Sequence, residues 1–129
     1  DYNIDWDYFC DWIKKFPEIH FILVQGNHDI LYRIDYLNAG IELVEELILD
    51  PFSFSHEKIK SDFYNISGHV HPSVRLRGPA RQGLNLPCFY FSNEHALLPA
   101  FGTFTGFVSL TPSRSDQVFV IAENQIIRV

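Results

Sequence analysis

The sequence has few cysteines and lacks the features of an exported or membrane-spanning protein. Only Cys10 and Cys88 are present, without a Cys-x-x-Cys spacing. We therefore expect free buried thiols in a reducing compartment, the cytoplasm, rather than a disulfide. No stretch of about 18 consecutive apolar residues occurs, so no membrane span is expected. The first residues, "DYNIDWDYF", carry no basic segment followed by an apolar one, which argues against a signal peptide.

Basic residues are also scarce and unevenly placed. The chain has ten basic and sixteen acidic residues, a formal net charge of −6. Residues 1–62 hold thirteen acidic and five basic residues, whereas residues 63–129 hold three and five. Three of the latter five fall in "RLRGPAR", at Arg75, Arg77 and Arg81. This balance excludes a general nucleic-acid coat but leaves one local basic segment for an anionic substrate.

Length and composition predict one domain with a sheet-rich core. The 129 residues are enough to bury a hydrophobic core, and we expect residues 1–129 to form a single domain. Apolar residues make up 47% of the chain, which excludes wholesale disorder. Aromatic residues make up 16% and include twelve phenylalanines, which favours strands.

Periodicity and turn residues predict a mixed α/β fold. An apolar stripe of Trp6, Phe9, Cys10 and Ile13 is typical of an amphipathic helix over 5–15. A helix followed by the strand "HFILV" (20–24) is half of a βαβ unit, so we expect the chain to begin in the middle of a fold. The further expected elements are a helix over 30–40 ended by Gly40, two strands within 41–57, a strand within 62–72, a loop over 73–87, strands over 87–92 and 106–110, and a hairpin over 117–129 turning at Glu123-Asn124.

Four of the six histidines follow apolar strands directly. His28 follows "FILVQGN", His56 follows "PFSFS", and His69 and His71 follow "FYNISG". Strand ends of a parallel or mixed sheet share one edge, so these side chains are expected to converge. Neutral imidazole is the commonest metal ligand, which predicts a metal site. In "GHVH" the two histidine rings would lie on the same side of the chain if the segment were extended. In a tight loop they could instead bind two different metal ions.

Other polar residues near these histidines have two interpretations each. Gly26 and Gly68 either allow close backbone approach or simply end their strands. Asn27 either offers an amide oxygen to a hard cation or caps a turn. His20 and His95, taken alone, are expected to be hydrogen-bonded loop or core residues.

These residues resemble a known family. The blocks "GNHD" (26–29), "SH" (55–56) and "GHVH" (68–71) are similar, in order and spacing, to the last three blocks of the calcineurin-like metallophosphoesterases. Residues 68–129 further resemble a bacterial branch encoded beside DNA ligase and helicase genes, described as DNA phosphodiesterases or endonucleases. The family fold is a two-sheet sandwich with flanking helices.

The resemblance implies roles for single residues. Asn27, His56 and His69 would bind one metal ion, and His71 would bind a second. His28 would contact the phosphate, stabilising charge or protonating the leaving group. Asp29 would orient His28. From its position alone, Asp29 is equally suited to cap the helix that follows.

The resemblance also implies a dinuclear centre, although two of its sequence blocks are not present here. The intact family site holds two divalent ions, for which Mn²⁺ is our first choice and Fe or Zn²⁺ are alternatives. The family's D-x-H and G-D blocks, which carry the bridging aspartate, have no counterpart in this sequence. We therefore expect the C-terminal portion of the domain, with one metal ion or none on this chain alone.

The arginine segment follows "GHVH" closely and is expected to border the same edge. Arg75, Arg77 and Arg81 would grip phosphate groups of a phosphoester substrate, with DNA a candidate. The alternative is a solvated basic loop that pairs with the acidic half. Phe101 and Phe104 either stack on a base or anchor their loop in the core.

We thus expect an α/β metallophosphoesterase-like hydrolase that cleaves phosphodiesters in its parent protein. One alternative is a non-catalytic binding or assembly module that pairs with another copy through an exposed sheet edge. A second is a structural mononuclear metal site. A third keeps the enzyme class but changes the substrate to a small nucleotide or a phosphoprotein.

Overall fold

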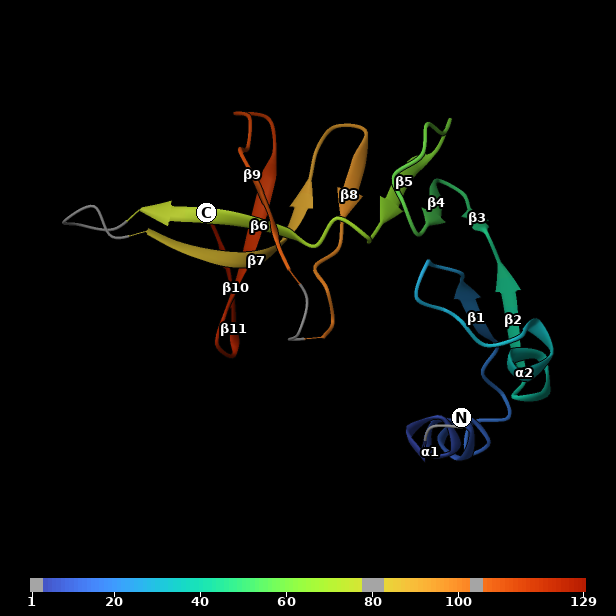
Figure 1. Ribbon diagram of the computed structural model, residues 1–129. Coiled ribbons are helices and arrows are strands. Elements are labelled where there is room, and N and C mark those ends of the chain that lie inside the picture. Colours follow the sequence, from blue (N-terminus) through green and yellow to red (C-terminus); the bar gives the residue numbers. More distant parts are fainter. Residues whose placement is uncertain (1–3, 78–82, 103–105) are drawn as a thin grey trace. The chain divides into compact units, whose positions relative to one another are not determined.

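The chain divides into two compact units in the computed structural model (Figure 1). The structure describes residues 4–77, 83–102 and 106–129. One unit ends at Glu45 and the other begins at Glu46, and each is described by itself. The expectation of a single domain over 1–129 stays a prediction.

The first unit is a small parallel α/β arrangement. β1 and β2 pair in parallel, with Phe21 opposite Ile41. Parallel neighbours need a crossover connection, and α2 lies within that connection. The predicted first helix and first strand are confirmed to within two residues at each end. The elements of this unit are α1 (Ile4–Ile13), β1 (Phe21–Val24), α2 (Arg33–Asn38) and β2 (Ile41–Val44).

An apolar cluster holds this unit together. Ile13 of α1, Tyr36 of α2, and Ile41 and Leu43 of β2 are all buried in it. The indole of Trp6 meets the ring of Tyr36 edge-on, with centroids 5.4 Å apart. Two members of the predicted apolar stripe, Ile13 and Trp6, therefore pack in this cluster, whereas Phe9 is 42% exposed.

The end of α2 follows its sequence signal. Gly40 has a φ of +81°, and its amide donates to the carbonyl of Leu37 at 3.0 Å. A positive φ is costly for residues with a Cβ, so glycine suits this position. The stop predicted at Gly40 is confirmed, although α2 is shorter than the expected helix over 30–40.

The second unit is built on sheet pairing. Among the described residues, nine strands form one sheet, whose main path runs β11-β10-β7-β8-β5-β4-β3, while β6 pairs with β7 and β9. The strands are β3 (Glu46–Leu49), β4 (Phe52–Ser55), β5 (Tyr64–Ser67), β6 (Pro72–Arg77), β7 (Gly83–Phe91), β8 (His95–Leu97), β9 (Val108–Leu110), β10 (Gln117–Ala122) and β11 (Gln125–Arg128).

The prediction of two strands within 41–57 is wrong, because this segment forms three. β2 pairs with β1 in the first unit, whereas β3 and β4 form an antiparallel hairpin in the second. Asp50-Pro51 lies between β3 and β4, and a proline has no amide hydrogen to continue a ladder. The run of apolar residues therefore breaks at the proline.

The loop predicted over 73–87 is also wrong. β6 and the first half of β7 form an antiparallel ladder in which Val74 faces Leu86 and Arg75 faces Asn85. Val74 is buried, while Arg75 and Arg77 are exposed. This alternation is the two-residue period of a strand with one solvated face. Arginines on the solvated face made the segment resemble a loop. β8 was not predicted either.

An apolar cluster centred on β6, β7 and β10 stabilises the second unit. Val74, Cys88, Val118 and Val120 are its buried members. Burial raises the pKa of the Cys88 thiol to about 11. Cys10 and Cys88 are both free thiols, as predicted, although Cys10 is only partly buried. The predicted hairpin is confirmed, since Ala122 pairs with Gln125 across the Glu123-Asn124 turn.

Within the described ranges, neither helix combines the length and apolar character that crossing a membrane requires. The expected absence of a membrane-spanning helix agrees with this finding.

Replacing Val120 by alanine should destabilise the second unit by about 2 kcal/mol, through lost burial and a small cavity. Val120 is 1% exposed and pairs with Ile127 of β11, which is 43% exposed. Ile127→Ala is the matched control and should cost less than about 1 kcal/mol. Urea unfolding measures both. Equal losses would contradict the placement of the core.

Candidate functional site

Two of the four strand-end histidines lie side by side in the second unit. β4 and β5 are parallel, with Ser55 opposite Ser67, so both strands end at one edge. His56 follows β4 directly, and its carbonyl accepts the amide of Gly68 at 3.0 Å. The Nε2 atom of His56 lies 2.9 Å from Nδ1 of His69. The predicted convergence holds for this pair.

The His56–His69 pair fits two ligands of one divalent ion. Imidazole nitrogens bind such ions at about 2.0–2.1 Å, which places two of them roughly 3 Å apart. The observed nitrogen separation is 2.9 Å. Among residues 4–77, 83–102 and 106–129, no group of three or more His, Cys, Asp or Glu side chains gathers to hold a metal ion. The described residues thus bring together two potential ligands and no larger set.

The "GHVH" segment is a tight loop. His69 and His71 have φ angles of 57° and 52°, in the left-handed region. The amide of Val70 donates to the carbonyl of Gly68 at 2.6 Å. Left-handed backbone costs about 1 to 2 kcal/mol per residue that has a Cβ. The extended alternative, with both rings on one side of a strand, is wrong, and the tight-loop alternative is the one observed.

His71 is held separately from the pair. Its Nδ1 lies 3.1 Å from the carbonyl oxygen of Gly106. A carbonyl oxygen only accepts, so Nδ1 carries the hydrogen in this contact and Nε2 is the nitrogen suited to a ligand role. A ring nitrogen that donates to a backbone carbonyl is common in metal-binding histidines, because it fixes the ring orientation.

Glu57 contacts the other nitrogen of His69. Its Oε1 lies 3.5 Å from Nε2, and the two side chains are 67% and 40% exposed. A carboxylate on the far nitrogen of a ligand histidine favours metal binding through the near one. The pattern analysis had not singled out Glu57. Its only sequence signal is its place directly after His56.

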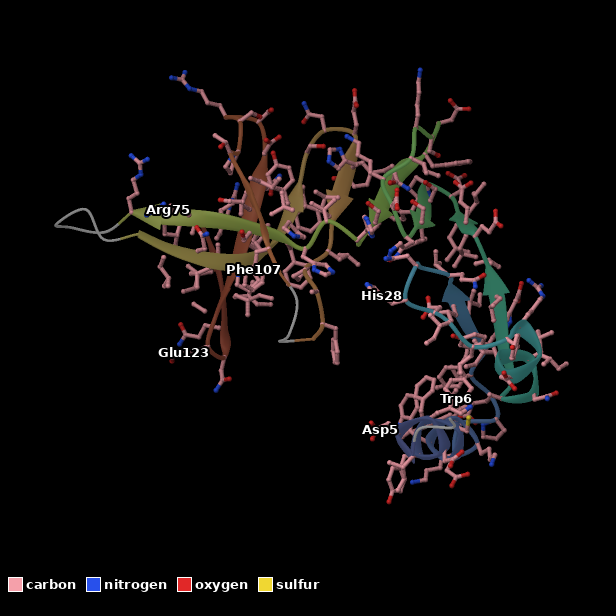
Figure 2. The ribbon with its side chains drawn as sticks, viewed as in Figure 1. Asp5, Trp6, His28, Arg75, Phe107 and Glu123 are labelled. Carbon is pink, nitrogen blue, oxygen red and sulfur yellow. The ribbon has the colours of Figure 1, made fainter. Side chains whose placement is uncertain are left out.

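The "GNHD" segment forms a closed turn in the first unit. The carboxylate of Asp29 accepts the amide of Gly26 at 2.7 Å, and the Asp29 amide donates to the Gly26 carbonyl at 3.2 Å. Asn27 and His28 lie between these residues and are exposed. Figure 2 shows His28 in this turn, just after β1. Asn27, His28 and Asp29 are described within the first unit only.

The helix-capping interpretation of Asp29 is wrong. α2 begins at Arg33, and its N-cap position is Tyr32, which makes no side-chain cap hydrogen bond. Asp29 lies too early to cap this helix and instead closes its own turn. His28 and Asp29 also line a cavity of about 700 Å³ whose other lining residues are mostly apolar.

His20 and His95 are ordinary hydrogen-bonded residues, as predicted. His20 Nε2 lies 2.8 Å from a Glu42 carboxylate oxygen in the first unit. His95 Nδ1 lies 2.7 Å from the Ser92 hydroxyl in the second unit. Burial, and then the charge of Lys58, lower the pKa of His95.

Arg75 and Arg77 present their side chains on the solvated face of β6. Figure 2 labels Arg75 on the hairpin of β6 and β7. A Cβ placed on Gly83 would lie 2.4 Å from Nε of Arg75, so the absence of a side chain at Gly83 makes room for the guanidinium. Guanidinium groups in this position suit a phosphate backbone.

Two further predicted residues, Arg81 and Phe104, lie outside the described residues. Phe101 is fully exposed, which contradicts the expectation that it anchors its loop in the core.

The comparisons with known proteins agree with a nuclease-like fold. No protein-family model matches the chain, and a search of curated proteins finds no match. The chain is similar to the crystal structure of Pseudomonas putida nuclease MPE. The two share 31% sequence identity with a TM-score of 0.74. The match covers 92% of this chain and 58% of the nuclease chain.

This similarity supports the fold class predicted from the sequence. The chain is α/β and sheet-dominated, with a small parallel sheet beside helices and a large mixed sheet. It spans 58% of the length of the nuclease chain, so the nuclease contains a substantial part with no counterpart here.

Replacing Asp29 by alanine should open the "GNHD" turn. The hydrogen bond from the Gly26 amide to a carboxylate is worth about 1.5 kcal/mol, so this amide should exchange with solvent roughly tenfold faster. Asp29→Asn keeps an acceptor and should preserve most of the protection. The Gln25 amide, bonded to the Val44 carbonyl at 2.8 Å, is the internal control. Unchanged Gly26 exchange in Asp29→Ala, read by NMR, would contradict this role.

Proposed function

We propose that this chain forms part of a metal-dependent phosphodiesterase that acts on DNA. The observation that carries the proposal is the His56–His69 pair, whose ring nitrogens lie 2.9 Å apart at the shared end of two parallel strands. The similarity to a nuclease over 92% of the chain supports the reaction class. A nuclease hydrolyses phosphodiester bonds.

The proposed metal ligands are a subset of the strand-end residues. His56 and His69 would hold one ion, and His71 would contribute to the second. Asn27 is proposed as a ligand from the sequence alone. Mn²⁺ is our first choice of metal, with Fe and Zn²⁺ as alternatives that also accept imidazole and oxygen ligands. Divalent ions, when bound, polarise phosphoryl oxygens and make water acidic enough to attack at neutral pH.

The chain's own side chains have the other roles. Exposed His28, in the turn that Asp29 closes, would contact the phosphate and either stabilise its charge or donate a proton to the leaving oxygen. Arg75 and Arg77 would bind phosphate groups of the DNA strand away from the scissile bond. We place Arg81 in the same role from the sequence alone.

A second candidate function is metal and DNA binding without hydrolysis. The observation that favours it is that the described residues gather two facing histidines and no larger ligand group. Pairing with another copy of the chain through a sheet edge stays a prediction of this alternative.

Elemental analysis after loading with Mn²⁺, followed by a hydrolysis assay, separates the two functions. The proposal expects chelator-sensitive cleavage of DNA. It expects close to two metal ions per chain only where the acidic ligands that this sequence lacks are supplied from elsewhere. DNA binding that survives a chelator, without any cleavage, would favour the non-catalytic alternative, whether the isolated chain holds one ion or none. Faster hydrolysis of a small nucleotide or a phosphopeptide than of DNA would change the substrate class.

Replacing His56 or His69 by alanine should weaken Mn²⁺ binding by roughly 100-fold or more, because each change removes a ligand. His20→Ala is the matched control, since His20 is an exposed histidine paired with a carboxylate in the first unit. Calorimetric titration with Mn²⁺ measures all three. If His20→Ala weakens binding as much as the other two, the assignment of the pair as ligands is wrong.

Replacing Arg75 or Arg77 by alanine should weaken binding of single-stranded DNA and reduce its dependence on salt. Each lost phosphate contact should lower the slope of log K against log salt by roughly 0.7. Lys14→Ala is the control, because Lys14 pairs with Asp11 on α1 in the first unit. Fluorescence anisotropy at several salt concentrations gives the slopes. If neither arginine variant changes this slope, the DNA does not contact Arg75 and Arg77, and the proposed role of these two residues is wrong.

A further inference from the structure

A buried polar face lies on β4 and β5, the two strands that end at the His56–His69 pair. Ser53, Ser55, Asn65 and Ser67 alternate along β4 and β5 with larger side chains and are between 0% and 8% exposed. Buried strand faces are ordinarily apolar, because a buried polar group must find a hydrogen-bond partner. Four polar side chains on one buried face therefore need an explanation.

Asn65 is the centre of this face and is 1% exposed. Its side-chain nitrogen donates to the hydroxyl of Ser55 at 2.9 Å and to that of Ser53 at 3.1 Å. Its oxygen accepts the amide of Ile59 at 3.4 Å. One side chain of β5 thus contacts both the end of β4 and the segment that follows it.

These bonds lead to the turn that carries His56. The Ser55 hydroxyl, which accepts from Asn65, donates to the carbonyl of Glu57 at 2.6 Å. Asn65 therefore holds the turn 55–59 at its start through Ser55 and at its end through Ile59. His56, whose ring faces His69, lies inside this turn.

Core filling alone does not account for the arrangement. Replacing a hydrogen-bonded polar cluster by apolar groups of similar shape is often neutral or stabilising, so stability gives little reason to bury an amide here. The amide of Asn65 instead fixes the relative positions of its partners, because a planar group with two donor hydrogens and an acceptor can bond to three groups at once.

We propose that Asn65 is a positioning residue that holds the turn 55–59 so that His56 Nε2 faces His69 Nδ1. Its effect on metal binding rests on the proposed function, whereas its effect on the two rings does not. Asn65 itself touches neither ring. It acts through Ser55 and the Ile59 amide.

The chain offers two matched controls on the same face. Ser53 bonds to Asn65 but lies at the far side from the turn, and it is 0% exposed. The Ser67 hydroxyl is buried opposite Ser55 and makes no hydrogen bond within the described residues. Ser53→Ala and Ser67→Ala therefore perturb the same buried face without cutting its connection to His56.

The test compares these controls with Asn65→Leu and Ser55→Ala. Two quantities are measured: the ring ¹⁵N chemical shifts of His56 and His69 in the metal-free chain, and the affinity for Mn²⁺. Asn65→Leu and Ser55→Ala should change the ring shifts of both histidines and weaken Mn²⁺ binding roughly 10- to 100-fold. The controls should leave the shifts unchanged, and His20 in the first unit is the reference within each spectrum.

Two outcomes would overturn the inference. In one, Asn65→Leu folds and leaves the ring shifts unchanged. In the other, Ser53→Ala or Ser67→Ala changes the rings as strongly as Ser55→Ala does. If Asn65→Leu fails to fold, the result for Ser55→Ala decides whether the inference holds. This variant removes the connection through Ser55 and keeps the bond from the Ile59 amide to Asn65. If the unmodified chain binds no Mn²⁺, the assignment of the His56–His69 pair as metal ligands fails for this chain alone, while the ring shifts still decide the role of Asn65.

Discussion

The parallel pairing of β4 with β5 is the constraint on which the candidate site depends. Because Ser55 lies opposite Ser67, both strands end at one edge of the sheet. The residues that follow the two strands are therefore neighbours. The pairing also places Asn65 opposite Ser53 and next to Ser55, so one register produces both the histidine pair and the buried network beneath it. A shift of one residue would turn both sets of side chains to the other face.

Local backbone geometry then decides which histidines form the pair. A spacing of two would keep His69 and His71 on one side of an extended strand, but both residues adopt left-handed φ angles. As a result His69 faces His56, while His71 bonds to the carbonyl of Gly106. Left-handed conformations in residues other than glycine cluster where side-chain direction matters more than backbone cost.

The sequence predicted the strand ends better than it predicted what surrounds them. "PFSFS" before His56 and "FYNIS" before Gly68 are apolar enough to be recognised as strands, and the edge they share follows from sheet topology. β6 was missed because the arginines on its solvated face outweighed the buried Val74 and the partly buried Leu76. Asn65 was missed for a related reason: a polar residue in a strand suggests an exposed position, and burial depends on partners that are distant in sequence.

The two ends of the second unit differ in composition. Around β6, β7 and β10 the core is apolar, with Val74, Cys88, Val118 and Val120 tightly buried. Around the ends of β4 and β5 the chain instead buries serines and an amide and places two histidines in left-handed conformations. Each of these features costs stability relative to an apolar, relaxed alternative. A fold tolerates such costs where a site must hold its side chains in one orientation before a ligand arrives. Left-handed His69 belongs to the pair itself, and Asn65 and Ser55 are hydrogen-bonded to the turn that carries His56.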